Sequence, residues 1–103
     1  MIWGTVTRLR AAATANAHGS SVYNWAGAAR VTVYDVKVQP VDSAEGDMKV
    51  SRARLLSKPG TTPDLTAFDR LISDGLTWQI VGDPGVFGDL LPHVEADLIR
   101  VTG

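Results

Sequence analysis

The fold is decided by residues 68–81, which read FDRLISDGLTWQIV. Two apolar runs are separated by Asp74-Gly75, a dipeptide that favours the type I′ turn of a β-hairpin because both of its positions need a positive φ. In the second run Leu76, Trp78 and Ile80 alternate with polar residues, which is typical of a strand with one buried face. The stretch therefore predicts a hairpin with strands at Phe68 to Ser73 and Leu76 to Val81.

Upstream of this hairpin, the clearest strand covers Arg30 to Gln39. Val31 and Val33 share one face of it, whereas Val36 and Val38 share the other. The change of phase near Tyr34-Asp35 predicts a bulge, which is a common device for curling a sheet into a barrel. Pro40 is expected to end the strand, because proline has no N–H to donate to a ladder.

The rest of the chain predicts further short strands joined by turns that contain glycine and proline. Ala11 to Ala17 is expected to be a loop or an irregular hairpin arm, and Gly82 to Gly85 a turn. About five to seven strands predict an all-β fold, a small antiparallel barrel or sandwich with long loops and little or no helix, in one domain over residues 1–103. The further strands are expected at Trp3 to Arg10 (with Trp3, Thr5, Thr7 and Leu9 on one face), Val22 to Trp25, Met48 to Leu56 and His93 to Val101. The expected core contains Val31 or Val36, Val38, Leu71, Trp78, Ile80, Val94 and Leu98.

The composition of the 103 residues is that of an ordinary globular protein, with 45% apolar and 20% charged residues. There is no cysteine, which excludes disulfides, thiolate metal sites and cysteine nucleophiles. The sequence turns polar after Gly4, so no signal peptide is expected. No apolar run approaches the ~20 residues of a membrane span, so no membrane partner is expected.

Residues of catalytic or ligand-binding type are few. His18 and His93 are the only histidines, and neither has the neighbours of a hydrolytic triad or a zinc site. The acids of the loop after Pro40 lack the ligand spacing of an EF-hand. Gly82 to Gly88 lacks the Lys-Ser/Thr ending of a P-loop. The sequence therefore predicts no catalytic residues, no cofactor and no metal, and a structural rather than an enzymatic role.

A small barrel with basic side chains can also bind single-stranded nucleic acid. Arg52, Arg54 and Lys58 are of the type that contacts phosphates. Trp78, however, alternates with polar residues, so we expect it to be buried in the core rather than to stack on bases. A stand-alone barrel that binds oligonucleotides stays an alternative.

The net charge of -1 combines two unequal halves of the chain. No acidic residue precedes Asp35, and only Arg70 and Arg100 are basic from Pro59 onward. If the fold keeps the halves apart, the surface has a basic and an acidic side, which suits a subunit that packs head-to-tail against its own copies. An evenly mixed surface is the alternative. The acids from Pro59 onward are Asp64, Asp69, Asp74, Asp83, Asp89, Glu95 and Asp97.

Several stretches of the chain, taken in order, resemble the head-to-tail stopper proteins of long-tailed bacteriophages. These proteins are also called head-closure or head-tail connector proteins, and the chain resembles especially those from phages of actinobacterial hosts. The order and spacing of the matching set cover nearly the whole sequence. The set is Val6 to Arg10, Asn24-Trp25, Val36 to Pro40, Thr66 to Leu71, Asp74-Gly75, Trp78, Val81 to Pro84, Pro92 and Arg100 to Gly103.

The resemblance implies a small β-barrel virion protein that is made in the host cytoplasm and forms a homo-oligomeric ring, a dodecamer in related phages. Such a ring lies in the neck at the head-tail junction, with the head-tail adaptor above it and the tail terminator and tail tube below. It retains packaged DNA and provides the surface for tail attachment. The alternative at the same junction is a tail-terminator, or tail-completion, ring protein.

The resemblance also implies a channel-gating loop, which matches this chain by its order along the sequence. Acidic side chains would suit such a gate, because they repel the DNA backbone. The residues of the implied loop are Val41, Asp42, Ser43, Ala44, Glu45, Gly46 and Asp47.

Overall fold

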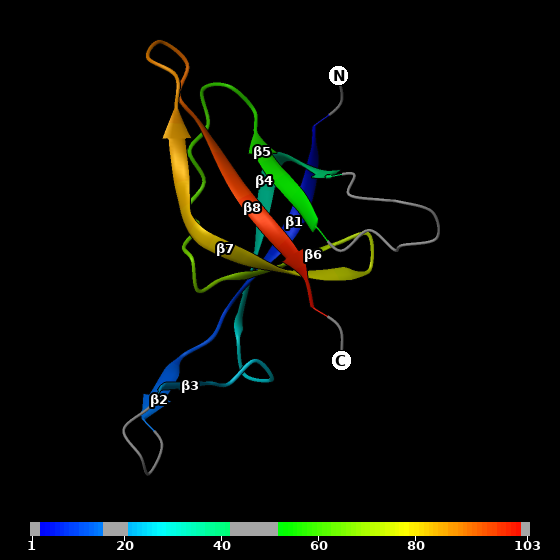
Figure 1. Ribbon diagram of the computed structural model, residues 1–103, viewed down its shortest axis with the longest axis vertical. Helices are drawn as coiled ribbons and strands as arrows, with labels where there is room; N and C mark the ends of the chain where they lie inside the picture. Colours follow the sequence, from blue (N-terminus) through cyan, green and yellow to red (C-terminus); the bar gives the residue numbers. More distant parts are fainter. Residues whose placement is uncertain (1–2, 16–20, 42–51, 102–103) are drawn as a thin grey trace.

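The computed structural model describes residues 3–15, 21–41 and 52–101, and in these ranges the chain forms strands and no helix. Six strands close into an antiparallel barrel in the order β1-β4-β5-β8-β7-β6, and two more form a separate ribbon (Figure 1). The prediction of an all-β barrel is therefore confirmed. The strands are β1 (Gly4–Arg10), β2 (Ala13–Ala15), β3 (Ser21–Tyr23), β4 (Ala29–Pro40), β5 (Arg52–Ser57), β6 (Arg70–Ser73), β7 (Leu76–Phe87) and β8 (His93–Arg100).

The bulge predicted near Tyr34-Asp35 is present in β4. Gly4 of β1 pairs with Val36 and Thr5 pairs with Tyr34, so Asp35 is an extra residue in β4, with a φ of 57°. Because of this insertion Val33 and Val36 are both buried. The first half of β4 pairs with β1 and the second half with β5, so one strand serves two sides of the barrel.

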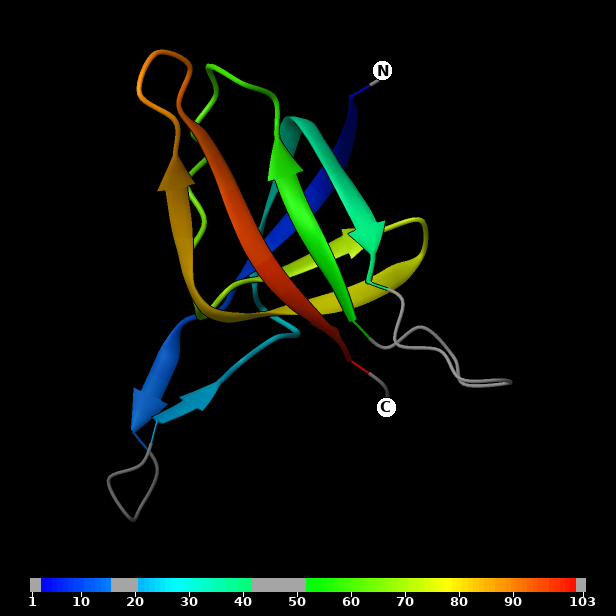
Figure 2. The ribbon, with the colours of Figure 1, turned by 45° about the horizontal axis from the view of Figure 1, so that its top comes forward.

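The prediction of a turn at Gly82 to Gly85 is wrong, because β7 continues through this stretch to Phe87. Val81 pairs with Asp97 and Gly85 pairs with Glu95, so the three residues 82–84 lie opposite the single residue Ala96 and form a bulge. Proline is tolerated there because, among the described strands, this half of β7 pairs only with β8. The bulge lets β7 bend around the base of the barrel and up one side (Figure 2).

The predicted hairpin at Asp74-Gly75 is confirmed, since both residues have a positive φ, 50° and 77°. It joins β6 to β7, and Leu71 pairs with Trp78. These two residues are almost fully buried, as is Ile80. The hairpin therefore supplies one wall of the core.

The core matches the prediction closely. Val36, not Val31, is buried, and Val38 packs at the edge of the cluster. In β1 it is Val6 that joins the core, whereas Leu9, from the expected face, is buried outside the main cluster. The main cluster is Val6, Val33, Val36, Ala53, Leu55, Leu65, Leu71, Trp78, Ile80, Val94, Ala96 and Leu98.

The hairpin arm expected at Ala11 to Ala17 is present as β2, which pairs with β3 in a two-stranded ribbon. The ribbon, called the arm below, projects from the barrel at the lower left of Figure 1. The radius of gyration, 14.7 Å, exceeds the about 13 Å of a compact domain of this length, consistent with a projecting element.

Candidate functional site

The predicted gating loop begins at the end of β4. Val41 is exposed, and its amide donates a hydrogen bond to the Arg52 carbonyl at 3.0 Å. Asp42, Ser43, Ala44, Glu45, Gly46 and Asp47 lie outside the described residues. The hydrogen bond nevertheless fixes where residues 42–51 leave the barrel and return to it, because both ends of the segment meet at this one pair. We call the surface around this pair the root groove.

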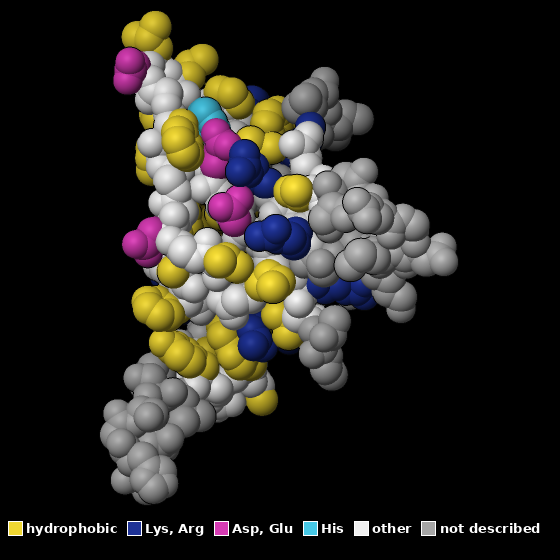
Figure 3. Space-filling model, viewed as in Figure 1, with side chains coloured by type: hydrophobic (Ala, Val, Ile, Leu, Met, Phe, Trp, Pro, Cys, Tyr) yellow, Lys and Arg dark blue, Asp and Glu magenta, His cyan; other side chains and the backbone are white. Residues whose placement is uncertain are grey.

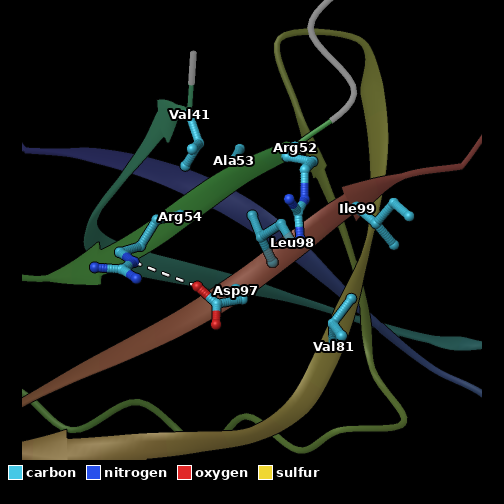
Figure 4. A pocket seen from close by; sticks show the side chains of 8 residues that line it. All are labelled: Val41, Arg52, Ala53, Arg54, Val81, Asp97, Leu98 and Ile99. Carbon is cyan, nitrogen blue, oxygen red and sulfur yellow. Dashed lines mark hydrogen bonds and ion pairs between the residues drawn. The ribbon is translucent and has the colours of Figure 1, made fainter. Parts of the chain in front are cut away.

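The root groove is an open hollow of about 360 Å³ on the outside of the barrel (Figure 4). Alternation along β5 places Arg52 and Arg54 outward while Ala53 is buried. Across the ladder, Arg52 pairs with Ile99 and Arg54 with Asp97. The lining residues are Val41, Arg52, Ala53, Arg54, Val81, Asp97, Leu98 and Ile99.

The charges beside the root groove are partly neutralised by a chain of ion pairs on β5 and β8. Arg54 donates to Asp97 through Nε at 3.3 Å and lies 3.7 Å from Glu95. The Glu95 carboxylate in turn lies 2.9 Å from the His93 Nε2 atom, within hydrogen-bonding distance. Figure 3 shows the resulting mixture of basic, acidic and hydrophobic side chains over this face. Arg52 has no hydrogen bond or ion pair with another described residue, so the described part of the groove does not neutralise its positive charge.

The groove has the character of a contact surface. Val41, Val81 and Ile99 are each about half exposed and give it apolar walls. A surface of apolar side chains beside an arginine that no described residue pairs with is suited to an acidic or carbonyl-bearing partner segment. The described residues contain no group of three or more His, Asp or Glu that could hold a metal ion.

The two histidines have different outcomes. His93 is partly buried, lies within hydrogen-bonding distance of Glu95, and has its ring centroid 6.1 Å from that of Phe87. His18 lies outside the described residues. Trp78 is only 3% exposed, so the expectation that it is a core residue is confirmed.

A partly buried ion pair that the sequence did not suggest lies where β1 leaves the barrel. Arg10 donates from Nε and Nη2 to the two carboxylate oxygens of Asp69, both at 2.8 Å, and from Nη1 to Asp64 at 2.9 Å. The Asp69 side chain is fully buried and also accepts from the Thr66 amide at 2.8 Å. We call this cluster the Arg10 clasp, and it ties the long connection between β5 and β6 to β1.

The clasp shifts the pKa values of its members. Burial alone would raise the pKa of Asp69, but the hydrogen bonds from Arg10 and from the Thr66 amide outweigh it and hold this pKa below its usual value. Hydrogen bonding to Arg10 also lowers the pKa of Asp64. The hydrogen bonds to Asp69 and Asp64 raise the pKa of Arg10. The clasp is therefore charged throughout the neutral pH range.

The arm is attached to the barrel by an aromatic cluster. Tyr23 stacks on both Trp25 and Phe68, with ring centroids 6.1 Å apart in each pair. The Arg70 guanidinium lies 4.2 Å from the centre of the Trp25 ring, within the range of a cation–π interaction. Together with the Arg10 clasp at the end of β1, where the chain enters the arm, these contacts hold the root of the arm against the barrel.

The prediction that basic and acidic halves of the chain form separate sides is not met by the described ion pairs. Arg8 and Arg10 pair with Asp64, and Arg54 pairs with Glu95. Antiparallel closure of the barrel brings distant parts of the chain together, so basic and acidic segments neutralise one another. What is left for a partner is the smaller set of charges that no described residue pairs with.

A second exposed feature lies at the connection between β7 and β8. Phe87, Leu90 and Leu91 are exposed there, and Leu90 is 95% exposed. The connection is braced by a hydrogen bond from the Gly60 amide to the Pro92 carbonyl at 2.8 Å. Hydrophobic side chains gather at the top of Figure 3, where this connection lies in Figure 1. A braced apolar tip of this kind is typical of a surface that another protein covers.

No protein-family model matches this sequence, and no curated protein is significantly similar to it. No helix among the described residues is long and apolar enough to cross a membrane.

Proposed function

We propose that this protein is a structural subunit of the head-to-tail connector of a long-tailed bacteriophage. In this role it forms a ring in the neck of the virion, below the portal and adaptor. The ring closes the filled capsid so that DNA is retained, and it provides the surface to which the tail attaches. The proposal requires no catalytic residue and no cofactor.

The observation that carries the proposal is the position of the Val41–Arg52 hydrogen bond. In the resembled family the channel-gating loop joins two central barrel strands. Here the segment at that place in the sequence joins β4 to β5, and both of its ends are held at one point on the barrel surface. The described core cluster lies in the barrel strands and in Leu65, so the pair at which the segment begins and ends is anchored on a packed barrel.

Two further features support a role in assembly. The apolar tip at Leu90 and Leu91 offers a contact surface at one end of the barrel. The arm, held by the Tyr23, Trp25 and Phe68 rings, offers another away from it. A ring subunit between an adaptor and a tail needs such separate surfaces for its different neighbours.

The test is a phage that carries a deletion of Asp42 to Gly46. We expect the purified variant to melt within a few degrees of the wild type, because the deletion leaves every described barrel strand intact. Filled heads assembled with the variant should lose DNA to an added nuclease. A matched variant that keeps the loop length but replaces Asp42, Glu45 and Asp47 by Asn, Gln and Asn separates the effect of charge from the effect of size.

The same experiment distinguishes the alternatives. If the protein is a tail terminator, heads stay closed and tails have abnormal lengths. If it is a nucleic-acid-binding barrel, the isolated monomer binds oligonucleotides with an affinity that falls steeply with salt. Unchanged DNA retention in assembled particles would show that residues 42–46 do not form a gate.

A further inference from the structure

Two strands of the barrel have an unpaired edge. The first half of β4, Ala29 to Tyr34, pairs with β1 alone among the described strands, since the Asp35 carbonyl accepts from the Lys58 amide and β5 begins its pairing at Val36. The second half of β7 pairs with β8 alone among the described strands. In the closed order β1-β4-β5-β8-β7-β6, two strands separate β4 from β7 in either direction, so the two edges are different surfaces of the subunit. Sheet edges are sites at which other chains can associate.

The edge at β4 borders a groove. This groove runs between Val31 to Tyr34 and the connection at Thr61 to Asp64, with Arg8 among its lining residues. The Arg8 Nη1 atom donates to the Asp64 carbonyl at 3.0 Å and lies 3.4 Å from the Asp64 carboxylate, so the charge of Arg8 is shared with the wall of the groove.

The same edge also carries an unpaired charge and apolar area. Arg30 is exposed and makes no hydrogen bond or ion pair with another described residue. Val31 and Tyr34 are exposed beside it, Tyr34 by 68%. We call Arg8, Arg30, Val31 and Tyr34 the β4 flank.

The edge at β7 has the opposite charge. No lysine or arginine occurs between Arg70 and Arg100. Asp83 and Asp89 are exposed and have no ion pair with another described residue, and Val86 and Phe87 are exposed between them. We call Asp83, Val86, Phe87 and Asp89 the β7 flank. Pro84 and the bulge around it make a regular intermolecular ladder unfavourable there, so contact through side chains is the expected mode.

We infer that the β7 flank of one copy docks against the β4 flank of a second copy. The contact brings apolar side chains of both flanks together and places Asp83 opposite Arg30. The two flanks are different surfaces, so the contact is heterologous, and a copy that uses both flanks binds two neighbours. This inference rests on the proposed function, because it names the surfaces by which the proposed ring is formed.

Charge reversal tests the inference. We expect the wild-type protein to self-associate in sedimentation velocity and native mass spectrometry. The variants Arg30→Asp and Asp83→Arg should each need at least about tenfold higher concentration to associate, because like charges then face each other. The double variant carries both reversals, keeps the wild-type net charge and should regain association.

A mixture of the two single variants is the sharper control. In an equimolar mixture, the intact β7 flank of Arg30→Asp meets the intact β4 flank of Asp83→Arg at one contact. At the next contact the two reversed charges face each other, and they are again opposite in sign. The mixture should therefore associate at a concentration at which each variant alone stays monomeric, and alternating copies should appear by mass. A two-fold symmetric contact through other surfaces has no reason to behave in this way.

The outcomes separate this inference from the proposed function. If the wild type and both single variants associate equally, the flanks are wrong while a ring remains possible, and the DNA-retention test still decides the function. If the wild type stays monomeric up to about 1 mM, where even a weak contact would be seen, the inference is overturned. Failure of the mixture to associate would also overturn it.

Discussion

The Arg10 clasp allows the most detailed prediction, for the variant Asp69→Asn. The Asp69 carboxylate is fully buried and accepts two hydrogen bonds from Arg10 and one from the Thr66 amide. Removing one partner of a buried ion pair costs about 3–5 kcal/mol. Arg10 is 35% exposed and keeps its contact with Asp64, so part of its charge remains solvated and paired. We therefore expect the free energy of unfolding to fall by about 2–4 kcal/mol at neutral pH.

The pH dependence gives this prediction a second readout. Because the pKa of Asp69 is lower in the folded protein than in the unfolded chain, the unfolded chain binds more protons in acid. The stabilisation is therefore complete above the unfolded pKa, about 3.9, and is lost as the pH falls through the folded pKa. Asp69→Asn should be less sensitive to pH in this window than the wild type.

Urea denaturation of both proteins between neutral pH and about pH 3 measures the two effects together. The matched control is Asp64→Asn, which removes a solvent-exposed carboxylate from the same cluster and should destabilise the protein less than Asp69→Asn. A loss below about 1 kcal/mol for Asp69→Asn, or an undiminished acid sensitivity, would refute the reasoning.

Three other predictions concern the barrel and the arm. Trp78→Ala should lower the free energy of unfolding by about 3–5 kcal/mol in denaturant, because the ring is buried, and a loss below about 1 kcal/mol would mean that it is not. Gly82→Ala should cost about 1 kcal/mol or more because φ is 73° at this bulge, whereas Gly4→Ala, with no positive φ, should be nearly neutral; equal effects in thermal melts would contradict this. Arg70→Ala removes the cation–π contact with Trp25 and should speed amide exchange in the arm more than in the barrel, and uniform exchange would show that the contact does not hold the arm.

The parts of the fold that could be predicted from the sequence depend on neighbouring residues. The hairpin at Asp74-Gly75 follows from the positive φ that both residues adopt, and the bulge at Asp35 follows from the change of hydrophobic phase within one strand. The alternation of β8 was equally readable, since Val94, Ala96 and Leu98 are all buried.

The parts that could not be predicted depend on which strands are neighbours. A proline such as Pro84 indicates the end of a strand that is paired on both edges, because it has no N–H to donate. At this position β7 pairs with β8 alone among the described strands, and only the strand order of the barrel shows this. Arg10 and Asp69 are 59 residues apart, so no local pattern indicates their contact. The only local signal for the clasp is the spacing of Thr66 and Asp69, which form a turn through two hydrogen bonds.

The candidate site was predictable only in its position along the chain. The resemblance placed a functional loop after Pro40, and the structure describes Val41 at its start. The root groove itself is assembled from β4, β5, β7 and β8. The sequence could not indicate that Arg52, Arg30 and Asp83 have no ion pair among the described residues, because it does not show which charges the fold brings together.

The central claim, that this protein is a ring subunit of the phage neck, is tested most directly by electron cryo-microscopy of virions that carry it. The expected result is a ring of six-stranded barrels between the portal-adaptor assembly and the tail, with Val41 and Arg52 facing the channel and the β4 and β7 flanks of adjacent copies in contact. A map in which the barrel is absent from the neck, or lies elsewhere in the particle, would contradict the claim.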